Sequence, residues 1–177
     1  MSGIEVPVIE TPRLRLRALV DADLDAFAGM VGDVEVMRYL GTPPFDRNGA
    51  WRKMALLAGH WQLRGYGMWA VVDRATSGFV GRVGLWNPEG WPGLEVGWIL
   101  PREQWGRGLA TEAAEAALGF AFERLGAHHV ISVIHPANVR SIRVAERLGE
   151  RFERSDIIGS IGVSIYGIAR EDWRPRR

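Results

Sequence analysis

The chain has 177 residues, and its 22 basic and 21 acidic side chains give a formal net charge of +1 at pH 7. This balance argues against the broad basic surface that marks a nucleic-acid-binding protein. The sequence contains no cysteine, which excludes disulfides, thiolate metal ligands and a cysteine nucleophile. No apolar run approaches the ~20 residues that span a bilayer, and no signal-peptide pattern is present at the N-terminus. We therefore expect one cytoplasmic domain covering residues 1–177.

The first half of the chain predicts one strand, three helical segments and two further strands. Apolar and basic residues alternate at 13–17, which indicates a strand with one buried face. Three helical patterns follow, the last of them capped by Asp46: 21–31, 34–40 and 46–61. Two strands follow at 68–72 and 79–86, joined by a turn at 73–78. A loop rich in turn residues, 87–93, completes this half.

The second half alternates strands and helices. A strand at 94–100 leads through a glycine-bearing loop into an alanine-rich helix that runs to about residue 125. A near-continuous apolar run at 130–134 predicts a buried central strand, and a helix and a hairpin follow at 139–148 and 152–169. These elements predict a single α/β (α+β) domain with a mixed, mostly antiparallel sheet of six to seven strands and helices on both faces.

The loop before the alanine-rich helix, residues 105–112, is a candidate anion-binding site. The first N–H groups of a helix have no partner inside the helix, and the peptide dipoles add partial positive charge there. Gly106 and Gly108 lack the Cβ that would keep a ligand away from these donors. The patterns Gly-x-x-x-x-Gly-Lys-Ser/Thr and Gly-x-Gly-x-x-Gly are absent, which argues against a phosphate-loop hydrolase and a Rossmann dehydrogenase. The loop alone fits a simple chain reversal equally well.

The segment Trp105-Gly-Arg-Gly-Leu-Ala-Thr-Glu112 resembles motif A of the GNAT superfamily of N-acetyltransferases, Arg/Gln-x-x-Gly-x-Gly/Ala. Gly108 and Ala110 take the small-residue positions. Trp105 departs from the general motif and looks like the variant of the RimJ/RimL-like branch. Three other stretches resemble the same branch, so that the similarity extends in order over about residues 11–173: 11–17, Asn138-x-x-Ser141 followed by Leu148-Gly149, and 170–173.

This resemblance implies a GNAT domain that moves an acetyl group from acetyl-CoA to an amine by direct attack, with no covalent enzyme intermediate. The backbone of 98–100 would face the pantetheine arm, strand 130–134 would splay away, and the loop 106–111 would hold the pyrophosphate. Asn138 is expected to cap the next helix and to bond the pantetheine amide. The implied cofactor-binding residues are Trp98, Ile99, Leu100, Trp105, Gly106, Arg107, Gly108, Leu109, Ala110, Thr111, Asn138 and Ser141. No spacing of His, Asp or Glu suggests a metal site.

Glu95 and Ser141 are the candidates for the two proton transfers that this reaction needs. Glu95 either accepts the proton of the substrate ammonium, directly or through water, or faces solvent or pairs with an arginine. The Ser141 hydroxyl either donates to the leaving thiolate, as the resemblance suggests, or serves only the start of its helix. His135 is a weaker candidate at the end of an apolar strand, and His60 either faces the acceptor pocket or lies on the surface.

The sequence leaves the acceptor open: a protein N-terminal amine, an antibiotic amine, a polyamine or a small metabolite. A non-catalytic module that binds or senses acyl-CoA is the main alternative, and it would keep the loop and Asn138 without needing Glu95 or Ser141. A purely structural or interaction role is a third interpretation, and it would leave the glycine loop without a purpose. We expect no nucleic-acid or membrane partner, and a homodimer is compatible with the sequence.

Overall fold

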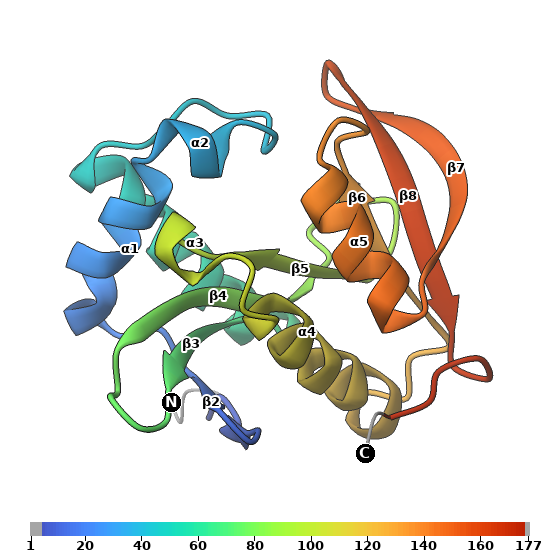
Figure 1. Ribbon diagram of the computed structural model, residues 1–177, viewed down its shortest axis with the longest axis horizontal. Coiled ribbons are helices and arrows are strands. Elements are labelled where there is room, and N and C mark those ends of the chain that lie inside the picture. Colours follow the sequence, from blue (N-terminus) through green and yellow to red (C-terminus); the bar gives the residue numbers. More distant parts are fainter. Residues whose placement is uncertain (1–4, 176–177) are drawn as a thin grey trace.

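The structure is a computed structural model that describes residues 5–175, and these residues form one mixed sheet of eight strands (Figure 1). The strand order is β1-β2-β3-β4-β5-β6-β8-β7, and all neighbours are antiparallel except the parallel pair β5 and β6. The strands are β1 (Ile9–Glu10), β2 (Leu14–Arg17), β3 (Met68–Asp73), β4 (Phe79–Trp86), β5 (Glu95–Ile99), β6 (His129–Ile134), β7 (Arg151–Ile158) and β8 (Ile161–Ala169).

The mixed, mostly antiparallel architecture is confirmed, but the sheet has eight strands where six to seven were expected. The additional strand is β1, which has two residues and pairs with β2 through Ile9 and Glu10. A two-residue strand is too short for the alternation of apolar and polar residues to reveal it.

Helices cover both faces of the sheet, as predicted (Figure 1). On one face lie α1 (Leu24–Val31), α2 (Val34–Met37) and α3 (Arg47–Arg64), and on the other α4 (Leu109–Gly119) and α5 (Val139–Leu148). Three shorter turns complete the set: η1 (Asp21–Asp23), η2 (Arg102–Gln104) and the π-helical turn η3 (Phe120–Arg124), which continues α4. No helix within residues 5–175 is long and apolar enough to cross a membrane.

The larger hydrophobic core lies between α4 and the sheet. Ala113, Ala114 and Ala117 are fully buried, and their small side chains let the helix lie close to the strands beneath it. Val83 and Val96 supply the facing surface from β4 and β5. This packing fixes the start of α4, and therefore the loop before it, against the end of β5.

The opposite face of β5 points toward α1–α3. Ile99 packs there with Met68 and Leu57, whereas Val96 and Trp98 join the α4 core, as the alternation of a strand requires. This second face carries a smaller core, and part of it is hollow.

Strands β5 and β6 share one register pair, Glu95 with Ile131, and then separate. The Ile131 N–H donates to the Leu94 carbonyl at 2.8 Å. Past this point the Ser132 hydroxyl, rather than a β6 backbone N–H, lies 2.9 Å from the Val96 carbonyl oxygen. The expected parting of strand 130–134 from β5 is confirmed, and it leaves a gap at the middle of the sheet.

Candidate active site

Two glycines give the loop after β5 its shape. Gly106 and Gly108 have φ angles of +73° and +76°, in the left-handed region that strains residues with a Cβ. Gly108 is the N-cap of α4, and no side chain caps the helix there. The backbone N–H groups in the first turn of α4 are therefore available to an anionic ligand.

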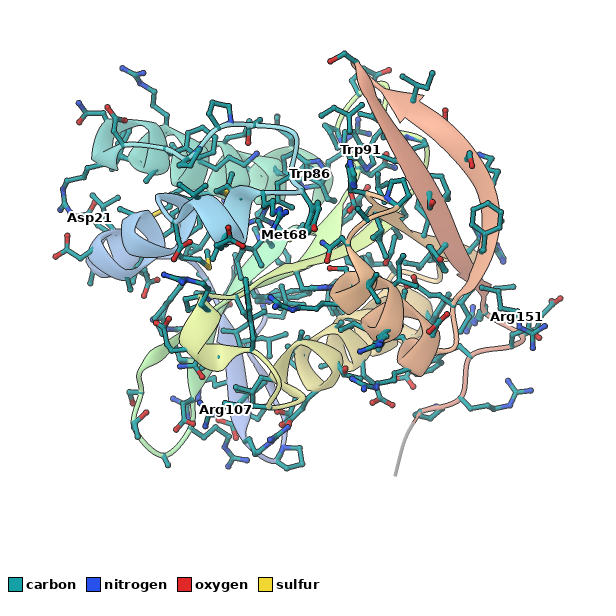
Figure 2. All side chains as sticks on the ribbon, turned by 45° about the horizontal axis from the view of Figure 1, so that its top comes forward. Asp21, Met68, Trp86, Trp91, Arg107 and Arg151 are labelled. Carbon is teal, nitrogen blue, oxygen red and sulfur yellow. The ribbon has the colours of Figure 1, made fainter. Side chains whose placement is uncertain are left out.

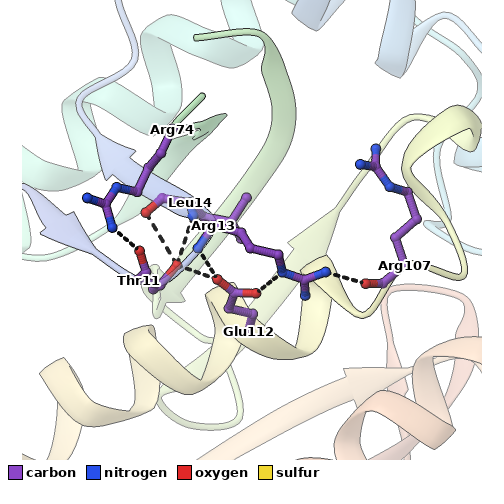
Figure 3. A network of polar contacts seen from close by, with 6 residues as sticks. All are labelled: Thr11, Arg13, Leu14, Arg74, Arg107 and Glu112. Carbon is purple, nitrogen blue, oxygen red and sulfur yellow. Dashed lines mark hydrogen bonds and ion pairs between the residues drawn. The ribbon is translucent and has the colours of Figure 1, made fainter. Parts of the chain in front are cut away.

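A polar network between α4 and the turn that precedes β2 braces the same loop (Figure 3). The Arg13 guanidinium donates to the Arg107 carbonyl at 2.9 Å and to Glu112 Oε2 at 2.6 Å. Glu112 Oε1 also accepts from the Thr11 hydroxyl at 2.6 Å and from the Arg13 N–H at 2.9 Å. Burial opposes the ionised form of Glu112, but these bonds outweigh it and lower its pKa. The loop conformation thus depends on Arg13, which lies 94 positions earlier in the chain than Arg107.

A groove of about 690 Å³ runs past this loop between the end of β5 and α5. Its charged lining consists of one carboxylate, Glu35, and four arginines: Arg38, Arg140, Arg143 and Arg147. Clustered arginines and unpaired backbone donors at a helix start suit a ligand with several phosphate groups. The residues present therefore fit the acetyl-CoA that the sequence resemblance implies.

The structure brings all the predicted cofactor-binding residues to this groove except Arg107. The Arg107 side chain is exposed and hydrogen-bonds Gln104 instead. The sequence-based prediction also missed the arginines of α5. Their spacing of three and four residues, which places side chains on one face of a helix, was the signal that could have found them.

A second cavity, of about 240 Å³, opens on the α1–α3 side of the sheet. Much of its wall is aromatic, and Figure 2 shows Trp86 and Trp91 in the upper part of the view, above Met68 and away from Arg107. Residues that line both this cavity and the groove include Trp98, Ile99, Asn138 and Ser141. The two spaces therefore meet where β5 separates from β6, beside the start of α5.

Ser141 lies at this junction. Asn138 caps α5 as predicted, because its Oδ1 accepts from the Ser141 N–H at 3.2 Å. The Ser141 hydroxyl oxygen in turn accepts from the Trp98 indole N–H at 3.3 Å. That bond uses a lone pair of the oxygen, so the hydroxyl hydrogen can still donate to a group at the junction.

Glu95 lines the smaller cavity, and its Oε2 accepts from the Trp91 indole N–H at 2.7 Å. Burial raises the pKa of Glu95 to about 7. The hydrogen bond from Trp91 has the largest effect that lowers this pKa, and the positive charge of Arg82 has the next largest. The Val133 N–H and the Lys53 charge contribute further in that direction. A carboxyl group with a pKa near 7 can both take up and release a proton at neutral pH.

The alternative readings of Glu95 do not match this geometry. The Glu95 side chain is only partly exposed, and it forms part of the wall of the smaller cavity. None of the ion pairs formed within residues 5–175 includes Glu95. It is neither a carboxylate on a wet strand face nor one held by a contacting arginine.

A second carboxyl group, Glu150, is 2% exposed and was not predicted from the sequence. Burial raises its pKa well above the ordinary value, with Ser132 opposing and Glu95 adding to the rise. Ser132 Oγ lies 3.0 Å from Glu150 Oε1 and 2.9 Å from the Val96 carbonyl oxygen. The Ser132 hydroxyl has one hydrogen and two acceptors within reach, the Glu150 carboxyl oxygen and the Val96 carbonyl oxygen. The Ser132 hydroxyl thus offers Val96 a hydrogen bond at the point where the strands part.

The two histidines considered as candidates lie in different environments. His135 lines the smaller cavity, with its ring 5.3 Å from that of Tyr39. His60 is buried: its Nδ1 lies 2.8 Å from the Tyr66 carbonyl oxygen, and its Nε2 accepts from the Asn87 N–H at 3.2 Å. His60 is therefore a structural residue beneath the loop after β4, neither on the surface nor in the cavity wall.

Comparison with known proteins places these features among acetyltransferases. The sequence profile described as "Acetyltransferase (GNAT) domain" matches residues 13–151. The protein YkkB of Bacillus subtilis (strain 168) is 32% identical over 165 residues, which are 88% of this chain and 92% of YkkB. An acetyltransferase structure from Agrobacterium tumefaciens str. C58 has a TM-score of 0.84 at 28% identity, covering 95% of this chain and 97% of that one. A ribosomal-protein-S5-alanine acetyltransferase from Vibrio fischeri shares the fold, with a TM-score of 0.71 at 19% identity over 96% of this chain and 100% of that one.

Proposed function

Because the chain belongs to the GNAT acetyltransferase family, we propose that it moves the acetyl group of acetyl-CoA to an amine by direct attack on the thioester. The observation that carries the proposal is the meeting of two spaces beside Trp98 and Ser141. One is the arginine-lined groove suited to phosphates, and the other is an aromatic cavity that contains a carboxyl group with a pKa of about 7.

We assign the groove to acetyl-CoA and the cavity to the acceptor. In this assignment the N–H groups at the start of α4 and the arginines of α5 hold the phosphates. The backbone edge of β5 that β6 leaves uncovered accepts the pantetheine arm. The thioester then lies at the junction, within reach of Ser141. The motif at 105–112 and the shared fold of the Vibrio fischeri protein support a place in the RimJ/RimL-like branch.

The proposed chemistry assigns one proton transfer to Glu95 and one to Ser141. Glu95 takes one proton from the substrate ammonium, so that the neutral nitrogen attacks the thioester carbonyl carbon. The carbon–nitrogen bond forms, the nitrogen passes its second proton to a water molecule and the carbon–sulfur bond breaks. The Ser141 hydroxyl donates a proton to the departing sulfur and regains one from the water that received the second proton of the nitrogen. Glu95 suits the first transfer because it is ionised just above pH 7 and faces the acceptor cavity.

An acceptor screen tests the proposal. Purified protein is mixed with acetyl-CoA and a panel of amines, and released thiol is measured against reactions without amine and without protein. We expect thiol release with at least one amine, and a marked loss of it in Glu95→Gln at neutral pH. If CoA binds by calorimetry but no amine releases thiol, the protein is an acyl-CoA-binding module and the proposed transfer is wrong.

A further inference from the structure

The smaller cavity contains three charged side chains from three different elements. Arg82 comes from β4, Glu95 from β5 and Lys53 from α3. The β4–β5 register pairs Arg82 with Ile99 and Trp86 with Glu95, so Arg82 and Glu95 lie on the same face of the sheet, displaced from one another along it. The cavity thus has two cations and one carboxylate.

These charges do not neutralise one another by contact. No ion pair among residues 5–175 contains Arg82, Lys53 or Glu95. The Arg82 Nε atom is buried and has no hydrogen-bond partner within the described residues. The Lys53 ammonium lies over the Trp86 ring, 5.4 Å from its centroid. A buried donor without a hydrogen-bond partner costs folding free energy, above all on a charged group. In many binding sites a ligand supplies the missing partner.

The space between the charges is kept open by glycine. Gly84 and Gly97 face each other in the β4–β5 ladder, between the pair that contains Arg82 and the pair that contains Glu95. A Cβ on Gly97 would lie 3.4 Å from Glu95 Oε1 and 3.3 Å from the Met68 methyl group. With glycine at this position, a ligand can approach both the carboxylate and the cations.

The electrostatics of the cavity favour an added negative charge. Burial lowers the pKa of Arg82 to about 10, so the guanidinium stays charged at neutral pH, with Glu95 opposing the shift. Burial and the Arg82 charge both lower the pKa of Lys53, which means that the two cations are close enough to repel each other. An anion placed between them would relieve this repulsion and pair the orphaned Arg82 donor.

We propose that the acceptor is a small primary amine that also carries an anionic group, with Arg82 and Lys53 receiving the anion and Glu95 receiving the ammonium. This inference rests on the proposed acetyl transfer and narrows its substrate class. A polyamine would bring a second positive charge into a site that already has an excess of cations. A simple monoamine would leave Arg82 without a partner. A zwitterionic amine matches both ends of the cavity.

Matched pairs of amines test the proposal by thiol release from acetyl-CoA. L-Phenylalanine is compared with L-phenylalaninamide, and β-alanine with β-alaninamide, while taurine and 2-aminoethylphosphonate replace the carboxylate by other anions. In the wild-type protein, kcat/KM for the acid should exceed that for the amide by about tenfold to a hundredfold, the range for hydrogen bonds between charged groups. Spermidine should be a poor acceptor.

The Arg82→Met variant should bring the acid-to-amide ratio close to one, and Arg82→Lys should retain part of the preference. Comparing ratios between variants cancels the intrinsic reactivity of each amine. Arg64→Met is the matched control: Arg64, at the end of α3, pairs with the exposed Glu89 at 3.3 Å and should keep the wild-type ratio. Removing a buried, unpaired charge should not unfold the protein. Melting temperature and CoA titration confirm that each variant is intact.

The outcomes separate this inference from the proposed function. If thiol is released and amides are used as well as acids, the anion site is wrong while acetyl transfer stands. If the ratio survives in Arg82→Met, Arg82 does not receive the anion and the inference is also overturned. If no amine releases thiol, calorimetry on the CoA-saturated protein decides. Binding of the acids that is lost in Arg82→Met supports the site, and absence of such binding refutes it.

Discussion

Replacing Trp91 by phenylalanine should raise the pKa of Glu95. The Trp91 indole N–H donates to Glu95 Oε2 at 2.7 Å, and this bond is the strongest of the effects that favour the ionised carboxylate. A hydrogen bond to a charged group is worth about 1.5–3 kcal/mol, and about 1.4 kcal/mol corresponds to one pKa unit. Phenylalanine keeps an aromatic ring in the cavity wall but has no donor. The pKa should therefore rise from about 7 by about one to two units.

Carbon-13 NMR of protein labelled at the glutamate carboxyl groups measures this shift without an acceptor. The Glu95→Gln variant assigns the resonance, and Trp51→Phe, at an exposed position on α3, is the matched control. A base is active only when ionised, so acetyl transfer should fall as pH decreases through the pKa. In Trp91→Phe the fall should begin at higher pH. An unchanged midpoint in Trp91→Phe, or a wild-type midpoint at the ordinary value of 4.5, would refute the reasoning.

Four further outcomes are expected. Glu95→Gln should reduce kcat/KM more at neutral than at high pH, where the amine is already neutral; an equal loss at every pH would indicate a positioning role. Gly108→Val should weaken CoA binding about tenfold or more by calorimetry, because a β-branched residue at the Gly108 φ of +76° is strained by about 1–3 kcal/mol. The control variant Gly59→Ala in α3 should bind CoA with the wild-type affinity. Ser141→Ala should slow the single-turnover chemical step about a hundredfold with little change in CoA affinity, and a destabilised variant with the wild-type rate would limit Ser141 to helix capping. The free energy of unfolding should fall as pH rises above the ordinary Glu pKa of 4.5, since folded Glu150 keeps its proton when the unfolded side chain has lost it; Glu150→Gln should flatten that dependence in pH-resolved denaturation.

The layout of the fold was predictable where local signals agree with one another. The helix at 139–148 has the predicted bounds because Asn138 caps its start and Gly149, at φ +92°, ends it. The hairpin of β7 and β8 turns at 159–160, as its glycine indicated. The second helical pattern ends at Met37 rather than residue 40, and the last turn of the alanine-rich helix is π-helical. Apolar spacing does not distinguish such turns from regular α-helix.

The site was predictable only in part, because its chemistry depends on neighbours that are distant in sequence. The loop and the Asn138–Ser141 pair were evident from local patterns. Arg82 was not, since a lone arginine in a strand normally faces solvent, and the other elements that line the cavity enclose it only in the folded chain. Glu150 directly follows a helix end and looks like a surface residue in the sequence. In the folded chain it is buried beside Ser132 of β6.

The brace that Arg13 forms with the loop couples the edge of the sheet to the cofactor site. Arg13 directly precedes β2, and the two-residue β1 lies beside it as the terminal strand of the sheet. If the brace makes cofactor binding more favourable, then by thermodynamic reciprocity a bound cofactor also stabilises β1 and β2 in their places at the edge of the sheet. Cofactor-saturated protein should therefore resist proteolytic nicking near its N-terminal edge, and the same occupancy should hold that edge closed against pairing with a foreign strand.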